Sequence, residues 1–184
     1  MQTLLKSFKQ FFLESVEPDG NYVAIKCEDV SRFLDLFKIK NKSGDAPPNG
    51  DYHCTLIYSK DTSMSPDLVL NLTSLGKQNT WLAHIVGVEC FDSVPKDGSR
   101  DATKSCVVLK LKSPQAEEAH ERLKIIGLKH SYPEYAAHVT LLYNVKQYEA
   151  HYIKDIINRE LSSMKPISIV LSGVYSQKIN KDYV

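Results

Sequence analysis

Two short segments, one in each half of the chain, share a pattern that restricts the fold more than any other feature. HCTLIY occupies residues 53–58 and HVTLLY occupies residues 138–143, so both read H-x-T-L-[IL]-Y. Each segment is apolar and contains β-branched residues, which is typical of a buried strand. Side chains alternate between the two faces of a strand, so a histidine and a threonine two positions apart share a face. The repeat therefore predicts two equivalent strands, each with an imidazole beside a hydroxyl.

The same alternation predicts which residues anchor these strands. It places Ile57 with His53 and Thr55, and Leu142 with His138 and Thr140. It places the remaining residues, including both tyrosines, on the opposite, anchoring face: Cys54, Leu56 and Tyr58 in the first strand, and Val139, Leu141 and Tyr143 in the second. Two such strands lying side by side would form one cluster of four polar side chains.

The rest of the chain alternates between helical and extended patterns. The periodicity predicts helices over 3–13, 28–39, 113–127 and 147–163, and strands over 22–27, 53–58, 68–72, 81–91, 105–112, 138–143 and 166–177. Loops are expected over 41–51 and 93–104, which are rich in turn-forming residues. Each half contains one H-x-T strand after a helix and a turn. This order predicts an α+β fold, with residues 1–184 forming a single domain of two related lobes.

Composition excludes several classes of protein. The 184 residues carry a formal net charge of +1, which argues against a long nucleic-acid partner. No apolar run is long enough to span a membrane, and the first residues lack the pattern of a signal peptide, so we expect a cytoplasmic protein. None of the four cysteines forms a C-x-x-C pair, and we interpret them as small buried hydrophobic residues in a reducing compartment.

The paired motifs suit acid–base chemistry on a phosphodiester. A free histidine has a pKa near 6.5, so one imidazole can accept a proton while the other donates one. In RNA-type cleavage the base takes the ribose 2′-OH proton, the 2′-oxygen attacks phosphorus and the acid protonates the leaving 5′-oxygen. Threonine hydroxyls can donate to the non-bridging oxygens as charge develops. We therefore predict that His53, Thr55, His138 and Thr140 are catalytic, with no metal and no cofactor, and either histidine can be the base.

The other four histidines, His84, His120, His130 and His151, lack this pattern. His120 is expected on the charged, solvated side of its helix. A lone histidine in a strand is more often a packed residue than a catalyst. The case for His53 and His138 depends on their equivalent positions in the two halves.

The two motifs resemble those of the two-histidine (2H) phosphoesterase superfamily, whose signature is a pair of H-x-[TS] motifs. The superfamily includes RNA 2′,5′-ligase-like proteins, cyclic phosphodiesterases and 2′,5′-oligoadenylate phosphodiesterases. This resemblance implies a bilobal α+β fold in which two antiparallel sheets line a central cleft and the helices lie outside.

A second likeness is narrower. GNYVA at 20–24 and SYPEYAAHVTLLYN at 131–144 are similar to stretches of phage anti-CBASS cyclic-oligonucleotide phosphodiesterases. This likeness implies metal-independent hydrolysis of cyclic di- or trinucleotides, such as 3′,3′-cyclic GMP–AMP, in the cytoplasm of an infected host. The 92–104 loop and the helix near 147–163 look longer than in the short phage members, and the N-terminal helix over 1–16 looks like an addition.

The same family implies an aromatic clamp on the nucleobases. Tyr22 and Phe91 are the candidates for its two sides, with Trp81 as the alternative to Phe91. Tyr132 and Tyr135 are candidates for the mouth of the pocket, although a turn stabilised by Tyr-Pro explains them equally well.

Two other functions fit the sequence. One is an enzyme for RNA ends, either a 2′,3′-cyclic phosphodiesterase or a 2′,5′-oligoadenylate phosphodiesterase. The other is a non-catalytic protein that sequesters a nucleotide messenger. The sequence leaves the base preference and the oligomeric state open.

Overall fold

The computed structural model describes residues 20–28, 30–37, 44–47, 50–60, 64–75, 80–93, 103–132 and 134–178. Its elements are, in order, β1 (Asn21–Cys27), α2 (Val30–Leu36), β2 (His53–Ser59), α3 (Pro66–Thr73), β3 (Thr80–Ser93), β4 (Lys104–Lys112), α4 (Pro114–Ile125), β5 (His138–Lys146), α5 (Gln147–Ser163) and β6 (Ser168–Lys178). The predicted helix over 3–13 and most of the predicted 93–104 loop lie outside the described residues.

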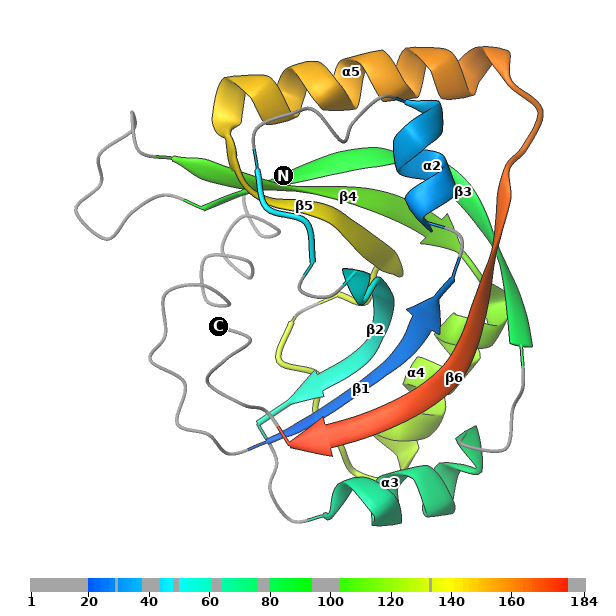
Figure 1. Ribbon diagram of the computed structural model, residues 1–184. Coiled ribbons are helices and arrows are strands. Elements are labelled where there is room, and N and C mark those ends of the chain that lie inside the picture. The colour runs from blue at the N-terminus through cyan, green and yellow to red at the C-terminus, as the bar shows by residue number, and fades with distance from the viewer. Residues whose placement is uncertain are drawn as a thin grey trace.

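The strands pair antiparallel and close into a barrel in the order β1-β2-β5-β4-β3-β6 (Figure 1). The predicted α+β class is confirmed. One group of three strands comprises β1, β2 and β6, and the other comprises β3, β4 and β5. The two groups meet at both edges: Cys54 of β2 pairs with Val139 of β5, and β3 pairs with β6. The two predicted antiparallel sheets are thus joined into one curved surface.

A pseudo-twofold relates the halves of the chain. Each half runs strand–helix–strand–helix–strand, and exchanging β1 with β4, β2 with β5 and β3 with β6 reproduces every strand pairing. The register follows the same rule, because His53 lies opposite Lys26 and His138 lies opposite Lys110. The H-x-T strands are therefore equivalent in three dimensions as well as in sequence.

Residues 68–72 lie in helix α3, so the strand predicted there was wrong. Ser65 caps the helix by accepting a hydrogen bond from the backbone N–H of Leu68, and proline follows at the first helical position. Within the helix, Val69 and Thr73 are buried at a spacing of four residues. The alternating leucines suggested a strand, but the helix-capping residues before them determine the structure.

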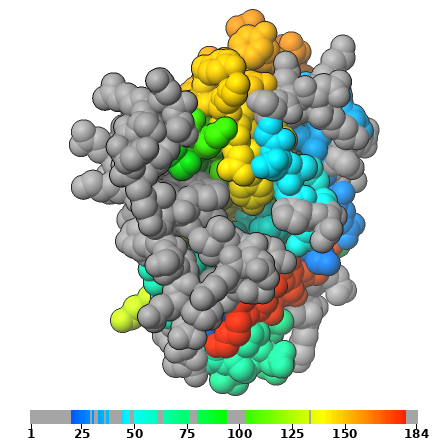
Figure 2. Space-filling model, turned by 60° about the vertical axis from the view of Figure 1, so that its left-hand side comes forward, coloured from blue at the N-terminus to red at the C-terminus, as the bar shows by residue number. Residues whose placement is uncertain are grey.

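Helices α3 and α5 each pack against the last strand of a half, α3 on β6 and α5 on β3 (Figure 1). The buried apolar core includes Leu56, Leu109 and Leu141 of the barrel strands and residues of all four described helices, such as Phe33, Val69, Leu123 and Ile157. In Figure 2, β5 and the start of α5 (yellow) lie beside the segment that leads into β2 (cyan).

All four cysteines are free thiols, and three of them are buried. No helix among the described residues is long and apolar enough to cross a membrane.

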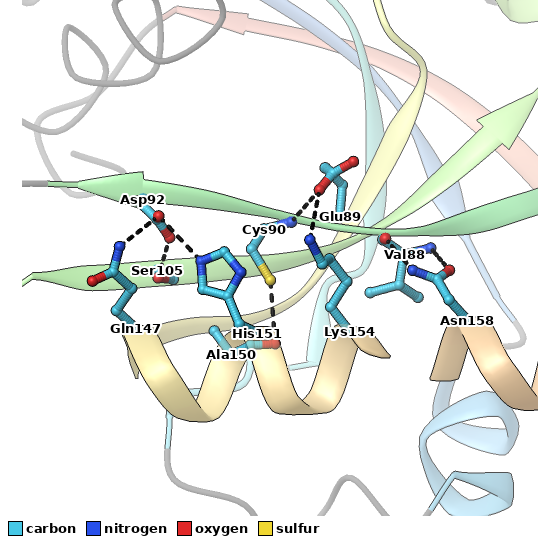
Figure 3. Close-up of polar contacts among 10 residues, drawn as sticks. All are labelled: Val88, Glu89, Cys90, Asp92, Ser105, Gln147, Ala150, His151, Lys154 and Asn158. Carbon is cyan, nitrogen blue, oxygen red and sulfur yellow. Dashed lines mark hydrogen bonds and ion pairs between the residues drawn. The ribbon is translucent and has the colours of Figure 1, made fainter. Parts of the chain in front are cut away.

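Polar contacts hold α5 along the free edge of β3 (Figure 3). β3 pairs with β6 only as far as His84, and beyond that point the side chains of α5 supply partners. The contacts with α5 are Asp92 with Gln147 and His151, Glu89 with Lys154, Cys90 with the Ala150 carbonyl, and Asn158 with the Val88 backbone. Asp92 also accepts a hydrogen bond from Ser105 of β4. These contacts between α5 and β3 fix the part of β3 that carries Phe91.

Asn158 makes the most specific of these contacts, because its amide satisfies both backbone groups of the buried Val88. The Val88 N–H donates to Oδ1 at 2.8 Å, and Nδ2 donates to the Val88 carbonyl at 2.9 Å. Asn158→Ala leaves both groups without these partners, and we expect the free energy of unfolding to fall by about 1–3 kcal/mol. Urea denaturation followed by circular dichroism measures the change. The exposed neighbour Arg159→Ala is the control, and equal stability of the two variants would contradict this role.

Candidate active site

Both H-x-T strands contain a β-bulge immediately after the threonine. In the first half Ala24 pairs with Thr55 but Val23 pairs with Ile57, so the register skips Leu56. In the second half Val108 pairs with Thr140 but Val107 pairs with Leu142, so the register skips Leu141. A bulge adds one residue to a strand and reverses the alternation of its side chains beyond that point.

The bulges bring Tyr58 and Tyr143 to the same side as the histidines and threonines, and both tyrosines line the cavity there. The expectation that they lie on the anchoring face was wrong, because it assumed unbroken alternation. The recurrence of tyrosine five positions after both histidines is the sequence signal that marks them.

A cavity of about 100 Å³ lies between the two strands. The predicted site residues all line it: His53, Thr55, His138, Thr140, Tyr22, Phe91, Tyr132 and Tyr135. Residues that the sequence prediction did not include complete the lining: Tyr58, His130, Glu134, Ala136 and Tyr143. Trp81, the alternative to Phe91, is 5% exposed and belongs to the hydrophobic core.

The two imidazoles are held in the same way. His53 Nδ1 lies 2.9 Å from the carbonyl oxygen of Asp51, and His138 Nδ1 lies 2.7 Å from that of Ala136. A carbonyl oxygen can only accept, so Nδ1 carries the hydrogen in both rings. Nε2 is therefore the nitrogen available to exchange a proton with a ligand in the cavity.

Burial sets the protonation of these rings. Desolvation lowers the pKa of both His53 and His138, and the backbone hydrogen bonds offset this only in part. A charge on His53 lowers the pKa of His138 further, so protonation of one ring disfavours protonation of the other. The arrangement favours states with no more than one imidazolium, which leaves at least one ring able to accept a proton.

An aromatic ring lies against each histidine. Tyr22 meets His53 edge-on with ring centroids 5.7 Å apart, and Phe91 meets His138 edge-on at 5.4 Å. Tyr22 comes from the strand beside β2, whereas Phe91 comes from β3 and reaches across β4. The structure thus places the two predicted clamp residues on opposite halves of the site.

His120 is buried against Tyr135, which lines the cavity, so the prediction of a solvated side chain was wrong. It is 4% exposed, its Nδ1 donates to the Leu56 carbonyl at 2.7 Å, and its ring stacks on Tyr135 with centroids 4.1 Å apart. The charged residues beside it in sequence occupy the other face of α4. His130 packs edge-on against His120 at 4.8 Å, and burial lowers its pKa to about 4.

Two strands related by a pseudo-twofold, each presenting an H-x-T motif to one cavity of an α+β barrel, define a two-histidine phosphoesterase. Comparison with known proteins identifies the family within this class to which the chain belongs. The family described as "Anti-CBASS protein Acb1" matches residues 19–183, and the chain belongs to this family. The anti-CBASS protein Acb1 of Vibrio phage KVP40 is 33% identical over 139 residues, which cover 72% of this chain and 76% of the phage protein. Family and fold together indicate a phosphodiesterase-type enzyme that counters CBASS.

Similar solved structures include TT0787 of Thermus thermophilus, with a TM-score of 0.49 and 12% identity over 85% of this chain and 83% of that chain. E. coli LigT, in a complex with 3′-AMP, has a TM-score of 0.46 and 14% identity over 89% of this chain and 97% of its own.

Proposed function

We propose that the protein is a metal-independent phosphodiesterase that opens cyclic oligonucleotide messengers such as 3′,3′-cyclic GMP–AMP. In this role it would act in the cytoplasm of an infected host and remove the signal on which CBASS defence depends. The observation that carries the proposal is the pair of imidazoles, each fixed through Nδ1, that face one cavity from equivalent strands. Membership of the Acb1 family supports the choice of substrate class.

The proposed reaction needs one neutral and one protonated imidazole. Nε2 of the neutral ring takes the proton of a ribose 2′-OH, and the 2′-oxygen forms a bond to phosphorus. The bond from phosphorus to the 5′-oxygen breaks, and Nε2 of the protonated ring gives its proton to that oxygen. The products of this step are a 2′,3′-cyclic phosphate and a free 5′-hydroxyl. Thr55 and Thr140 donate to the non-bridging oxygens, whose charge grows in the transition state.

Aromatic side chains supply the proposed binding surface for the bases. Stacking on an aromatic ring contributes about 1–3 kcal/mol per base and suits any nucleobase. Tyr22 and Phe91 flank the two histidines, and Tyr132 lies in the same cavity. Tyr135 differs from them, because one face of its ring is covered by His120. We therefore assign base stacking to Tyr22 and Phe91, whereas Tyr135 forms part of the cavity wall.

A nucleotide panel in EDTA tests the proposal. The panel contains cyclic di- and trinucleotides, a linear RNA with a 2′,3′-cyclic phosphate end, and 2′,5′-oligoadenylate, and mass spectrometry identifies the products. We expect cleavage of at least one cyclic oligonucleotide, and no cleavage of its 2′-deoxy analogue. Survival of every cyclic substrate, or activity only with added metal, would overturn the proposal. Turnover of the linear substrates alone would indicate an RNA-end enzyme, and tight binding without turnover would indicate sequestration.

The pH dependence follows from the lowered pKa values of His53 and His138. In the free enzyme both values lie below about 6.5, so the singly protonated pair becomes rare as the pH rises through neutrality. We expect kcat/KM to fall about tenfold per pH unit on the alkaline side. Bound phosphate favours imidazolium, so kcat should persist to higher pH than kcat/KM. Steady-state kinetics between about pH 5 and about pH 8.5 measure both profiles, and a kcat/KM that rises throughout this range would contradict the expectation.

A further inference from the structure

A third histidine lines the cavity and takes no part in the proposed proton transfer. His130 lies between α4 and β5, and its ring contacts the end of β2. The Tyr58 backbone N–H donates to His130 Nδ1 at 3.4 Å, and the Tyr58 carbonyl accepts a hydrogen bond from the Ser131 N–H at 2.8 Å. Both backbone groups of Tyr58 thus bind this segment, which fixes the His130 ring relative to β2.

The contact with Tyr58 determines which nitrogen of His130 carries the hydrogen. A backbone N–H can only donate, so Nδ1 carries no hydrogen and the neutral ring carries it on Nε2. His53 and His138 have the opposite arrangement, because their Nδ1 atoms carry the hydrogen. Nε2 of His130 has no hydrogen-bond partner among the described residues, and it is not fully buried. It can therefore donate to a ligand in the cavity that His130 lines.

The surroundings of His130 keep its ring neutral. Burial lowers its pKa to about 4, and protonation of His120 would lower it further. Aromatic side chains flank the ring, with the centroid of Tyr132 at 5.3 Å and that of Tyr135 at 6.1 Å. A phosphate group would favour a charged imidazolium, which this environment opposes. A neutral N–H donor among aromatic rings is better suited to a neutral, planar base.

We propose that His130 is a substrate-binding residue whose Nε2–H donates to the carbonyl oxygen of a nucleobase, O6 of guanine or O4 of uracil. This inference rests on the proposed phosphodiesterase function and adds a base preference to it. Adenine and cytosine carry an amino group at the corresponding position, which is itself a donor. His130 cannot become an acceptor there without losing the hydrogen bond from Tyr58, so it disfavours these two bases.

Calorimetry with uncleavable ligands tests the inference on the full chain. The first ligand is the 2′-deoxy analogue of cyclic GMP–AMP. In the second, hypoxanthine replaces guanine and keeps O6, and in the third, 2-aminopurine replaces guanine and lacks O6. We expect the wild type to bind the first two about 3–10-fold more tightly than the third, because one neutral hydrogen bond distinguishes them.

Two substitutions separate the roles of the two ring nitrogens. His130→Asn places an amide oxygen near the position of Nδ1, where it can accept from Tyr58, but it has no donor near Nε2. It should weaken binding of the guanine and hypoxanthine ligands about 3–10-fold and leave the 2-aminopurine ligand unaffected. His130→Gln places an amide N–H near Nε2 and should retain most of the affinity. His84→Asn, on the exposed face of β3, is the matched control.

Three results would overturn this role for His130. The first is a wild type with equal affinity for all three ligands, and the second is a His130→Asn variant that binds the guanine ligand as tightly as the wild type. The third is an equal loss for all three ligands in that variant, which would indicate a phosphate contact or a packing role.

Failure of the proposed function is a separate outcome. It appears as absence of turnover when the wild type is given the ribose form of cyclic GMP–AMP, and the affinities for the uncleavable ligands still decide the role of His130. A wild type that binds none of the three ligands would overturn both proposals.

Discussion

Replacement of His53 or His138 by alanine should lower kcat by about 10²–10⁴-fold, which is the usual contribution of one general acid or base. Each imidazole is fixed through Nδ1 by a backbone carbonyl, so the truncation removes a proton donor or acceptor and leaves the strand in place. The two groups act in one step, and we therefore expect the double variant to be little worse than the poorer single variant. Binding of an uncleavable cyclic dinucleotide should persist, because the aromatic residues and threonines remain.

Chromatography of the products measures kcat, and calorimetry measures binding. The matched control is His84→Ala, because His84 lies on the exposed face of β3 and its ring is hydrogen-bonded to Ser168, away from the cavity. Full turnover by either active-site alanine variant would contradict a catalytic role for that histidine. Loss of binding that matches the loss of turnover would instead indicate a role in holding the substrate.

Replacement of Thr55 or Thr140 by valine should have the next largest effect, a loss of about 10²-fold in kcat. Valine keeps the branched shape and the strand preference of threonine but cannot donate a hydrogen bond to a non-bridging oxygen. KM should change little, since the hydrogen bond strengthens as charge develops in the transition state. Steady-state kinetics on the same cyclic dinucleotide measure both constants.

Serine variants at the two positions provide the rescue, because they restore the hydroxyl and should recover most of the lost turnover. Thr80→Val, on the exposed start of β3, controls for the substitution itself. Valine variants that turn over substrate as fast as the wild type would show that the hydroxyls have no part in the reaction.

The sequence was sufficient to predict the elements that present these groups. The two H-x-T-L-[IL]-Y segments, each preceded by a helix and a turn, predicted an α+β fold with two related halves. Period-two alternation correctly placed His53 with Thr55 and His138 with Thr140, because the motif ends before the bulge begins. The four side chains line one cavity, as expected for two such strands lying side by side.

The errors have physical causes that lie outside local periodicity. Strand alternation could not place Tyr58 and Tyr143, because the bulges at Leu56 and Leu141 are visible only in the pairing with neighbouring strands. His120 was misplaced for a related reason. Its ring donates a hydrogen bond to the carbonyl of Leu56 on β2, and the sequence of α4 alone does not reveal this partner.

The pseudo-twofold explains why the site has two similar halves with different aromatic partners. The duplicated strands supply the same imidazole, hydroxyl and bulge to each side, and the residues that contact them have diverged. Tyr22 contacts both His53 and Thr55, whereas on the other side Phe91 contacts His138. Such divergence gives the two histidines different surroundings, which is what distinct acid and base roles require.

A crystal structure with a bound 2′-deoxy cyclic dinucleotide tests the central claim most directly. This ligand lacks the attacking hydroxyl, so it should remain intact in the cavity. We predict that oxygens around a single phosphorus lie within about 2.6–3.2 Å of Nε2 in both His53 and His138, directly or through one water. A ligand whose phosphates contact only one of the two imidazoles, or lie outside the cavity, would contradict the account.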